Sequence, residues 1–384
     1  VPADLVEAAK RREIAQMQFA ANSVSGLAST WSTALAFQGL DAPGDLVAAY
    51  QAVTPEAVNR LAATLLDPAH AVSAVLTPES SGKPVSGKGF GGAESFASSP
   101  DKPVKLPDWA EKALLKLDKP EPTPQPYVST LSNGIKLIVW PSHVSHTIQV
   151  SGQVRSTPSL QQPAGQDGVN DVTEALFSYG TTRYDRLAFQ KALDDIPAWE
   201  SAGSSFSLQV LTPDFAKGVA LLAENELHPA FGEKDFQVVR QQAAQAQAGE
   251  LLSPEHLFSR AIKMAVMPPK DPTLREATPQ SILSVTHDDV LAYYKKVWRP
   301  DVTTLVVTGD VSPERAQAVM EQAFGGWKAQ GAVPDIDLPA VPLSKASHAL
   351  VPDRSSVQDE VVLAETLGLT AAQPDHFMLQ LGNE

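Results

Sequence analysis

The sequence predicts an α+β fold built from repeated units, and three observations lead to this prediction. Asn133-Gly134 lies between two strand-like runs within 127–142, and this dipeptide favours the tight turn of a β-hairpin. Several helical stretches begin with a hydroxyl residue followed by proline, as in Thr54-Pro55 and Ser312-Pro313. That pattern is typical of a capped helix start. Third, one segment of the chain occurs twice, which indicates duplication.

The elements are assigned from hydrophobic spacing and from capping signals. Residues 3–66 are expected to be helical, and 71–78 is expected to be a strand that enters a turn. Residues 127–330 alternate between strands and helices, so we expect one α+β unit there. Its expected strands are two within 127–142, then 147–156, 204–213 and 303–311, and its expected helices are 168–178, 186–196, 213–228, 232–249, 254–267, 279–284, 286–298 and 312–327.

Residues 79–126 differ from the chain on either side, because they are rich in proline, glycine and serine. Such a composition buries too little apolar surface to fold alone. We therefore expect an interdomain linker, with one short amphipathic helix at 107–118. Residues 331–346 form a second proline-containing link, and 347–384 begin a further strand and helix.

The internal repeat defines the domain organisation. Residues 53–78 align without gaps to residues 285–310. Both copies have a threonine N-cap, an acidic first turn, an amphipathic helix, a proline and then a β run. The repeat predicts that 1–78 is the mostly helical C-terminal part of a preceding unit. On the same reading, 127–330 is a complete copy, and 331–384 is a link followed by the start of another.

Composition excludes several classes of function. A formal net charge of −14 argues against nucleic acid, because phosphate binding needs concentrated lysine and arginine. No apolar run approaches the ~18 residues of a membrane span. The absence of cysteine excludes disulfides, thiolate zinc sites and a cysteine nucleophile, and it suits an oxidising compartment. We expect a periplasmic protein, and we expect the sequence to be part of a longer polypeptide.

One short helix carries the strongest functional signal. The segment 168–181 reads GVNDVTEALFSYGT, which has the outline of a zinc-binding helix but no histidine. Further along the chain come GTTRYDRLAFQKAL, SFSLQVL, LLAENELHPAF, VTHDDVLAYYKKVWRPDVTTLVVTGDV and AFGGW. Taken in this order, these stretches resemble the pitrilysin/insulinase family of zinc metallopeptidases, over most of 1–78 and 127–384.

The resemblance implies repeated metallopeptidase-like units, each a mostly antiparallel sheet packed with helices on one side. The family's catalytic helix reads H-x-x-E-H, in which two histidines four residues apart bind zinc and the glutamate acts as general base. In this chain Asp171 stands at the first histidine, Glu174 at the catalytic glutamate and Ala175 at the second histidine. The family's third ligand is a glutamate on a later helix, but that helix has no acid from Phe236 through Gly249.

All three ligand positions are therefore replaced, and Glu250, at the end of the later helix, is the nearest acid to the third position. We expect no catalytic residue, no cofactor and no metal in this chain, because Glu174 alone has no activated water to deprotonate. The histidines offer no substitute site. We expect His143 and His146 to be surface residues that their spacing does not bring together, and Glu255-His256 to be a helix-start pair.

By its resemblance, the chain is expected to be the non-catalytic half of a zinc-dependent peptidase. It would form a chamber wall and position a peptide or unfolded protein, while zinc and an intact H-x-x-E-H lie in an upstream half or in a separate active subunit. The alternative is a non-peptidase homologue that acts as a scaffold or partner subunit. A third possibility is a peptide- or ligand-binding α+β protein unrelated to peptidases. Substrate, cleavage preference and oligomeric state are not readable from the sequence.

Overall fold

The computed structural model describes residues 1–66, 69, 71–74, 125–352, 360–369 and 373–382. Residues 1–74, 126–349 and 364–384 group into one compact unit. The expected linker, including its helix at 107–118, lies outside the described residues apart from 125–126. None of the helices in the described part of the chain has the length and hydrophobicity to cross a membrane.

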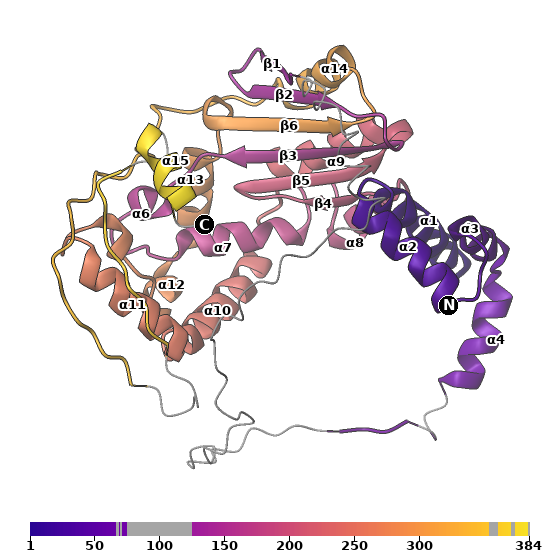
Figure 1. Ribbon diagram of the computed structural model, residues 1–384, viewed down its shortest axis with the longest axis horizontal. Coiled ribbons are helices and arrows are strands. Elements are labelled where there is room, and N and C mark those ends of the chain that lie inside the picture. The colour runs from indigo at the N-terminus through magenta and orange to yellow at the C-terminus, as the bar shows by residue number, and fades with distance from the viewer. Residues whose placement is uncertain (67–68, 70, 75–124, 353–359, 370–372, 383–384) are drawn as a thin grey trace, which may run out of the picture. The chain divides into compact units, whose positions relative to one another are not determined.

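Six strands form one mixed sheet in the order β1-β2-β6-β3-β5-β4, as Figure 1 shows. Neighbouring strands are antiparallel except for β2 and β6, which are parallel. The predicted hairpin is confirmed, because β1 and β2 pair across Asn133-Gly134 and Gly134 has a φ of 97°. The strands are β1 (Tyr127–Thr130), β2 (Lys136–Pro141), β3 (Thr147–Val154), β4 (Trp199–Ser201), β5 (Ser205–Leu211) and β6 (Thr303–Gly309).

The two faces of the sheet differ in polarity. In β5, Phe206, Leu208 and Val210 are buried, whereas Ser207 and Gln209 between them are partly exposed. Side chains alternate along a strand and paired residues share a face, so this division extends across the sheet. The second, open face carries mostly uncharged polar residues: Gln149, Ser151, Gln153, Ser201, Ser205, Ser207, Gln209, Thr304 and Thr308.

Helices cover the buried face of the sheet. α9 (Phe215–Leu227) packs against β5, and α14 (Pro313–Phe324) packs against β2 and α9. Gly152 of β3 makes room for this packing, because a Cβ there would lie 2.0 Å from the Phe206 ring. The Phe206 ring instead stacks with Phe324 at 6.2 Å between centroids. Burying a phenylalanine side chain stabilises the folded state by about 1.5–3 kcal/mol. The contact between Phe206 and Phe324 therefore helps to hold α14 against the sheet.

A second group of helices surrounds α7 (Val169–Leu176), which packs against α10 (Glu233–Glu250) and α13 (His287–Val297). Several helix starts are fixed locally: the Ser253, Thr286 and Ser312 side chains each accept a hydrogen bond from a backbone N–H in the first turn. The caps at Thr286 and Ser312 confirm the predictions from the sequence. The remaining helices are α1 (Ala3–Ala20), α2 (Val24–Ala36), α3 (Pro43–Ala52), α4 (Pro55–Leu65), α6 (Pro158–Gln161), α8 (Arg186–Asp194), α11 (Pro254–Val266), α12 (Pro279–Ser284) and α15 (Pro374–Gly382).

The repeat is visible in the helices but not in the sheets. α4 and α13 have the same length and start at equivalent threonines, Thr54 and Thr286, whose side chains each cap the helix. Val290, Tyr293 and Val297 of α13 are buried, whereas α4 has no buried residue. The same local pattern therefore gives the same helix with a different degree of packing.

The α+β prediction is confirmed as one mixed, mostly antiparallel six-stranded sheet packed with helices. Repeated sheet units are not seen in the described residues, which hold a single sheet. The strand expected at 71–78 is absent from its described part, 71–74, and residues 75–78 lie outside the description. A strand requires a paired neighbour for its backbone groups, and residues 71–74 pair with no strand in the described part of the chain. No strand occurs in the described residues of 347–384.

Candidate functional site

The helix with the degenerate zinc motif, α7, has two unlike faces. Asp171 and Ala175 are four residues apart, and both are exposed on the outer face. Val172 and Leu176 are fully buried on the inner face. The ligand positions of the resembled motif therefore point to solvent from a well-packed helix. An alanine has no ligand atom, so this outer face offers one carboxylate where a zinc site needs several donors.

Glu174, the retained glutamate of the motif, is bound to the protein backbone. The Ser204 N–H donates to its carboxylate, with N···O distances of 3.1 and 3.2 Å. The preceding residue is Gly203, whose φ of 137° is a conformation that side-chain-bearing residues rarely adopt. A Cβ on Gly203 would lie 2.4 Å from Glu174 Oε2. Glu174 thus fixes the turn between β4 and β5, which gives it a structural role without any metal.

A second carboxylate, Glu226 of α9, lies on the other side of this turn. The Gly203 N–H donates to Glu226 Oε2 at 3.0 Å, and the Tyr294 hydroxyl donates to the Glu226 backbone oxygen at 2.7 Å. Burial raises the pKa of Glu226 well above its ordinary value, and the negative charges of Glu200 and Glu174 raise it further. The hydrogen bond from Gly203 opposes this shift but is smaller. Burial therefore favours the protonated form of Glu226.

Glu200 of β4 is the third carboxylate of this group. Desolvation raises the pKa of Glu200 to about 7, although the Asn225 amide donates to it and lowers the value. The Asn225 Nδ2 lies 3.1 Å from Glu200 Oε1. No lysine, arginine or histidine nitrogen in the described part of the chain lies within ion-pair distance of this carboxylate. Glu200 is therefore poised to change charge near neutral pH.

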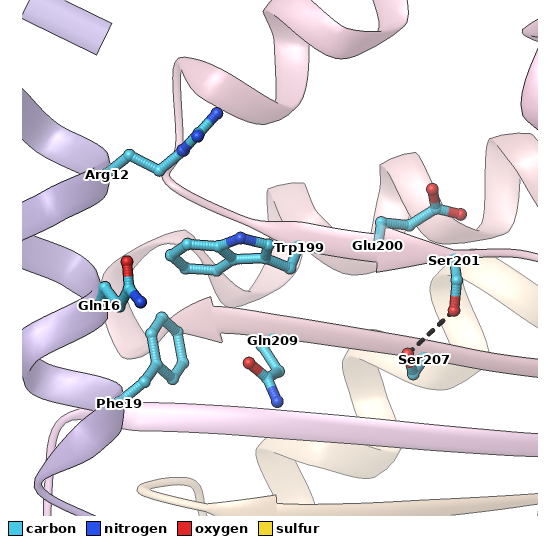
Figure 2. Close-up of a pocket in the computed structure, with 8 residues that line it drawn as sticks. All are labelled: Arg12, Gln16, Phe19, Trp199, Glu200, Ser201, Ser207 and Gln209. Carbon is cyan, nitrogen blue, oxygen red and sulfur yellow. Dashed lines mark hydrogen bonds between the residues drawn. The ribbon is translucent and has the colours of Figure 1, made fainter. Parts of the chain in front are cut away.

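Two cavities flank the edge strand β4, one on each face of the sheet. The cavity on the open face measures about 420 Å³. Figure 2 shows Trp199 of β4 beside Phe19 of α1, with the Glu200 side chain pointing away from Ser201 and Ser207. The Phe19 and Trp199 rings meet edge to face at 5.2 Å. The second cavity, about 600 Å³, lies between β4, α8 and the turn that follows α7, and Glu200 borders both cavities.

The structure also places the other predicted groups. Within the described ranges, no cluster of histidine and acidic side chains has a geometry that could hold a metal ion. α10, the helix expected to carry a third ligand, packs against α7, and its Phe236, Val239 and Ala244 are buried. Glu250 at its end instead lies 3.5 Å from His256. Glu174 and Glu250 thus contact other parts of the fold, and the outer face of α7 offers only the Asp171 carboxylate.

Two predictions about histidines are tested directly. His143 and His146 are exposed as expected, but the expectation that their spacing keeps them apart is wrong. Both Nδ1 atoms contact the Asp310 carboxylate, at 2.7 and 2.8 Å, because Asp310 follows a neighbouring strand and reaches between them. His256 lies in the first turn of α11, where its N–H donates to the Ser253 cap, and its ring contacts Glu276 at 2.7 Å.

Sequence reasoning missed Glu200, Asn225 and Glu226. A signal for Glu226 is present in the sequence, since it continues the apolar stripe of α9 formed by Phe215, Val219 and Leu222. An acid on such a stripe indicates a buried, functional or specially bonded group. Glu200 gave no signal, because β4 is only three residues long and becomes a strand only through its pairing with β5.

Comparison with known proteins relates the C-terminal region of the chain to a family. The family described as the peptidase M16 inactive domain matches residues 284–384, a region that begins after α7 and the degenerate motif. No curated protein sequence matches the chain. The match relates the C-terminal region to a domain that is described as inactive in its family.

Solved structures share the fold at low sequence identity. A protease from Helicobacter pylori matches with a TM-score of 0.50 and 19% identity, over 57% of this chain and 55% of that one. The M16 inactive domain from Pseudomonas fluorescens matches with a TM-score of 0.50 and 17% identity, over 58% and 55%. The periplasmic protease PqqL from Escherichia coli aligns with a TM-score of 0.46, 16% identity, and coverage of 58% and 26%. The match to the Helicobacter structure spans about half of that protein's length. The inactive-domain match relates residues 284–384 to the pitrilysin-like M16 peptidase family. The Helicobacter and Pseudomonas structures show that the fold is shared.

Proposed function

We propose that this chain is the non-catalytic half of a zinc-dependent M16 peptidase, where it forms a chamber wall and positions a peptide substrate. One observation carries the proposal: the zinc-motif helix is preserved in shape while its chemistry is replaced. Glu174 accepts the Ser204 N–H, and the two outer positions hold Asp171 and Ala175. A helix kept for packing but not for ligation fits a domain that contributes surface and not water activation.

In this proposal no residue of the chain is catalytic and none binds a cofactor. Zinc and an intact H-x-x-E-H belong to a partner half, either in the same polypeptide or in a separate active subunit. The match to the inactive-domain family supports this division, because such domains generally pair with catalytic halves. The peptide would lie against surfaces near α7 and β4, where the two cavities are found.

The proposal includes the domain organisation. Residues 1–78 are the mostly helical end of the preceding unit, and 79–126 are a linker. Residues 127–330 are the complete degenerate unit, which contains all six strands of the described sheet. Residues 331–384 begin a further unit. We also propose a periplasmic location, supported by the absence of cysteine.

The test combines metal analysis with peptide binding. The purified chain is analysed for zinc by mass spectrometry, assayed on a quenched unfolded peptide with and without a chelator, and titrated with the same peptide by fluorescence anisotropy. We expect substoichiometric zinc, no hydrolysis and measurable binding. Stoichiometric zinc together with chelator-sensitive hydrolysis would overturn the non-catalytic assignment. An absence of peptide binding would instead favour the scaffold or partner-subunit alternative.

A further inference from the structure

The larger cavity beside β4 combines a polar end with an apolar wall. It measures about 600 Å³, and its apolar lining includes Phe177, Phe189 and Leu193. Glu200 and Asn225 supply polar groups on the side of the sheet. A cavity of this size, polar at one end and apolar along its wall, fits a long side chain with an apolar stem and a polar head. Ligand-binding sites combine apolar walls with a few placed polar groups in this way.

The polar end of the cavity has unmet hydrogen-bonding capacity for a cation. Glu200 has no ion-pair partner in the described part of the chain. Asn225 is only 4% exposed, and its Oδ1 has no hydrogen-bond donor among the described residues. Both groups accept hydrogen bonds, so the matching ligand group is a donor with positive charge. The apolar wall would contact the methylene stem that carries it.

The one arginine that lines the cavity does not serve as the missing partner. Arg186 of α8 has its guanidinium 5.5 Å from the centroid of the Tyr179 ring, over which it lies. This cation–π contact holds the arginine away from Glu200. The carboxylate consequently stays available to a group that enters from outside.

We propose that this cavity is a subsite for an ammonium or guanidinium group on an apolar stem, as in a lysine or arginine side chain of a bound peptide. The inference rests on the proposed function, because it names the peptide feature that the non-catalytic half recognises. Glu200 is the principal specificity residue, Asn225 orients its carboxylate through the 3.1 Å hydrogen bond, and the aromatic wall receives the stem. A neutral or acidic side chain of the same length finds no equivalent partner there.

Binding at this subsite depends on pH in a defined direction. The titratable and charged groups around Glu200 are Arg186 of α8, Arg12 of α1, and Glu226 of α9 with Glu174 of α7 behind it. The cation binds the ionised form of Glu200, so binding releases a proton wherever the free carboxyl is protonated. Affinity for the basic peptide therefore rises as the pH increases through about 7, and affinity for a neutral peptide does not.

The experiment compares matched peptides on the full chain. One unstructured sequence, acetylated and amidated at its ends, is prepared with a central lysine, norleucine or glutamate, and binding is measured by fluorescence anisotropy at pH 6 and pH 8. At pH 8 we expect the lysine peptide to bind about tenfold tighter than the norleucine peptide, from one hydrogen bond to a charged group. In Glu200→Gln we expect the lysine and norleucine peptides to bind about equally, because the affinity for the lysine peptide falls to that for the norleucine peptide. Glu56→Gln, an exposed acid on α4, should keep the preference.

The outcomes separate the two ideas. Equal binding of lysine and norleucine peptides by the unaltered chain would overturn the subsite and leave the proposed function standing. A preference that survives Glu200→Gln would also overturn it. A norleucine peptide with a free N-terminus tests whether an α-ammonium group is the preferred source of charge. If no peptide binds, the proposed function fails, and Nα-acetyl-lysine methylamide is titrated while the Glu200 carboxyl resonance is followed by NMR. An unmoved resonance would then exclude the subsite itself.

Discussion

The positions of the zinc-motif outline on α7 differ in what they contribute to the fold. On the outer face, Asp171 and Ala175 are exposed and are not part of the core. Glu174, which is only partly exposed, is the inner position of the motif: it accepts the Ser204 N–H, beside a Gly203 that adopts a φ of 137°. The outer positions determine only whether a metal can bind, whereas the inner position determines the path of the chain. Structure is therefore expected to constrain Glu174 even where catalysis no longer does.

The inner region also carries an electrostatic penalty that the outer region lacks. Glu226 is buried beside Glu174 and Glu200, and the pKa of Glu226 is raised well above its ordinary value. Such grouped acids reduce stability as the pH rises, because the folded state retains protons that the unfolded state has already lost. Changes on the inner side should consequently alter stability, and changes on the outer side should alter it little.

The largest effect is expected at Gly203. Gly203→Ala places a side chain at a φ of 137° and 2.4 Å from Glu174 Oε2. Backbone strain and displacement of Glu174 together should lower the free energy of unfolding by about 3 kcal/mol, measured by urea denaturation. Gly249→Ala is the matched control, because nothing lies within 4 Å of the added methyl in helix α10. It should stabilise the protein by about 0.5–1 kcal/mol. Equal effects of the two changes would contradict the special role of the turn.

The next effect is expected at Glu174. Glu174→Ala leaves the Ser204 N–H without its acceptor, so the free energy of unfolding should fall by about 2 kcal/mol. Glu174→Gln keeps an acceptor oxygen and should cost less. In the Glu174→Ala background, Gly203→Ala should cost less than in the unaltered protein, because its steric conflict has been removed. Strict additivity of the two changes, seen in a double-mutant cycle, would show that Glu174 does not fix the turn.

A smaller effect of opposite sign is expected at Glu200. The pKa of Glu200 is raised from 4.5 to about 7, so its folded carboxyl holds a proton between these values while the unfolded one has lost it. Stability from this group is therefore lost as the pH rises from about 4.5 to 7. Glu200→Gln should equal the unaltered protein near pH 4.5 and exceed it by about 1–2 kcal/mol at pH 8, the shift being discounted for access to solvent. Thermal unfolding across this pH range measures the difference. An unchanged pH profile would exclude the raised pKa.

The elements that the sequence predicted correctly are those with local signals. The Thr286 side chain caps α13 by a hydrogen bond within the first turn of that helix, and Asn133-Gly134 forms the turn between β1 and β2. Elements that form only through contacts with other elements were harder to predict from the sequence. β4 forms only by pairing with β5, so a segment as short as Trp199–Ser201 carried no strand signal. α4 and α13 show the same limit, because their matching sequences predict two helices but not which of the two is buried.

In the candidate site, too, some features are readable from the local sequence and others are not. The outline of the zinc motif and the replacements at Asp171 and Ala175 are readable from the sequence, because they depend on spacing within one helix. The use of Glu174 is not readable, since its partner Ser204 lies 30 residues away in the chain. The grouping of Glu200 with Asn225 likewise depends on β4 packing beside α9. A motif can thus be recognised locally, but the present role of its residues depends on tertiary contacts.

The smallest effect on stability is expected on the outer face of α7, where Asp171→His and Ala175→His together restore two histidines four residues apart. Both positions are exposed, so the free energy of unfolding should change by less than about 0.5 kcal/mol. Two histidines on one helical face are two zinc ligands, and α10 supplies no acid from Phe236 through Gly249 as a third. We therefore expect weak zinc binding by calorimetry and no hydrolysis of a quenched peptide. Glu174 should remain bonded to Ser204 and not to a zinc-bound water. Chelator-sensitive hydrolysis by this variant would show that the inner glutamate is free to act as a base. It would also show that two side chains are all that separate this domain from an active one.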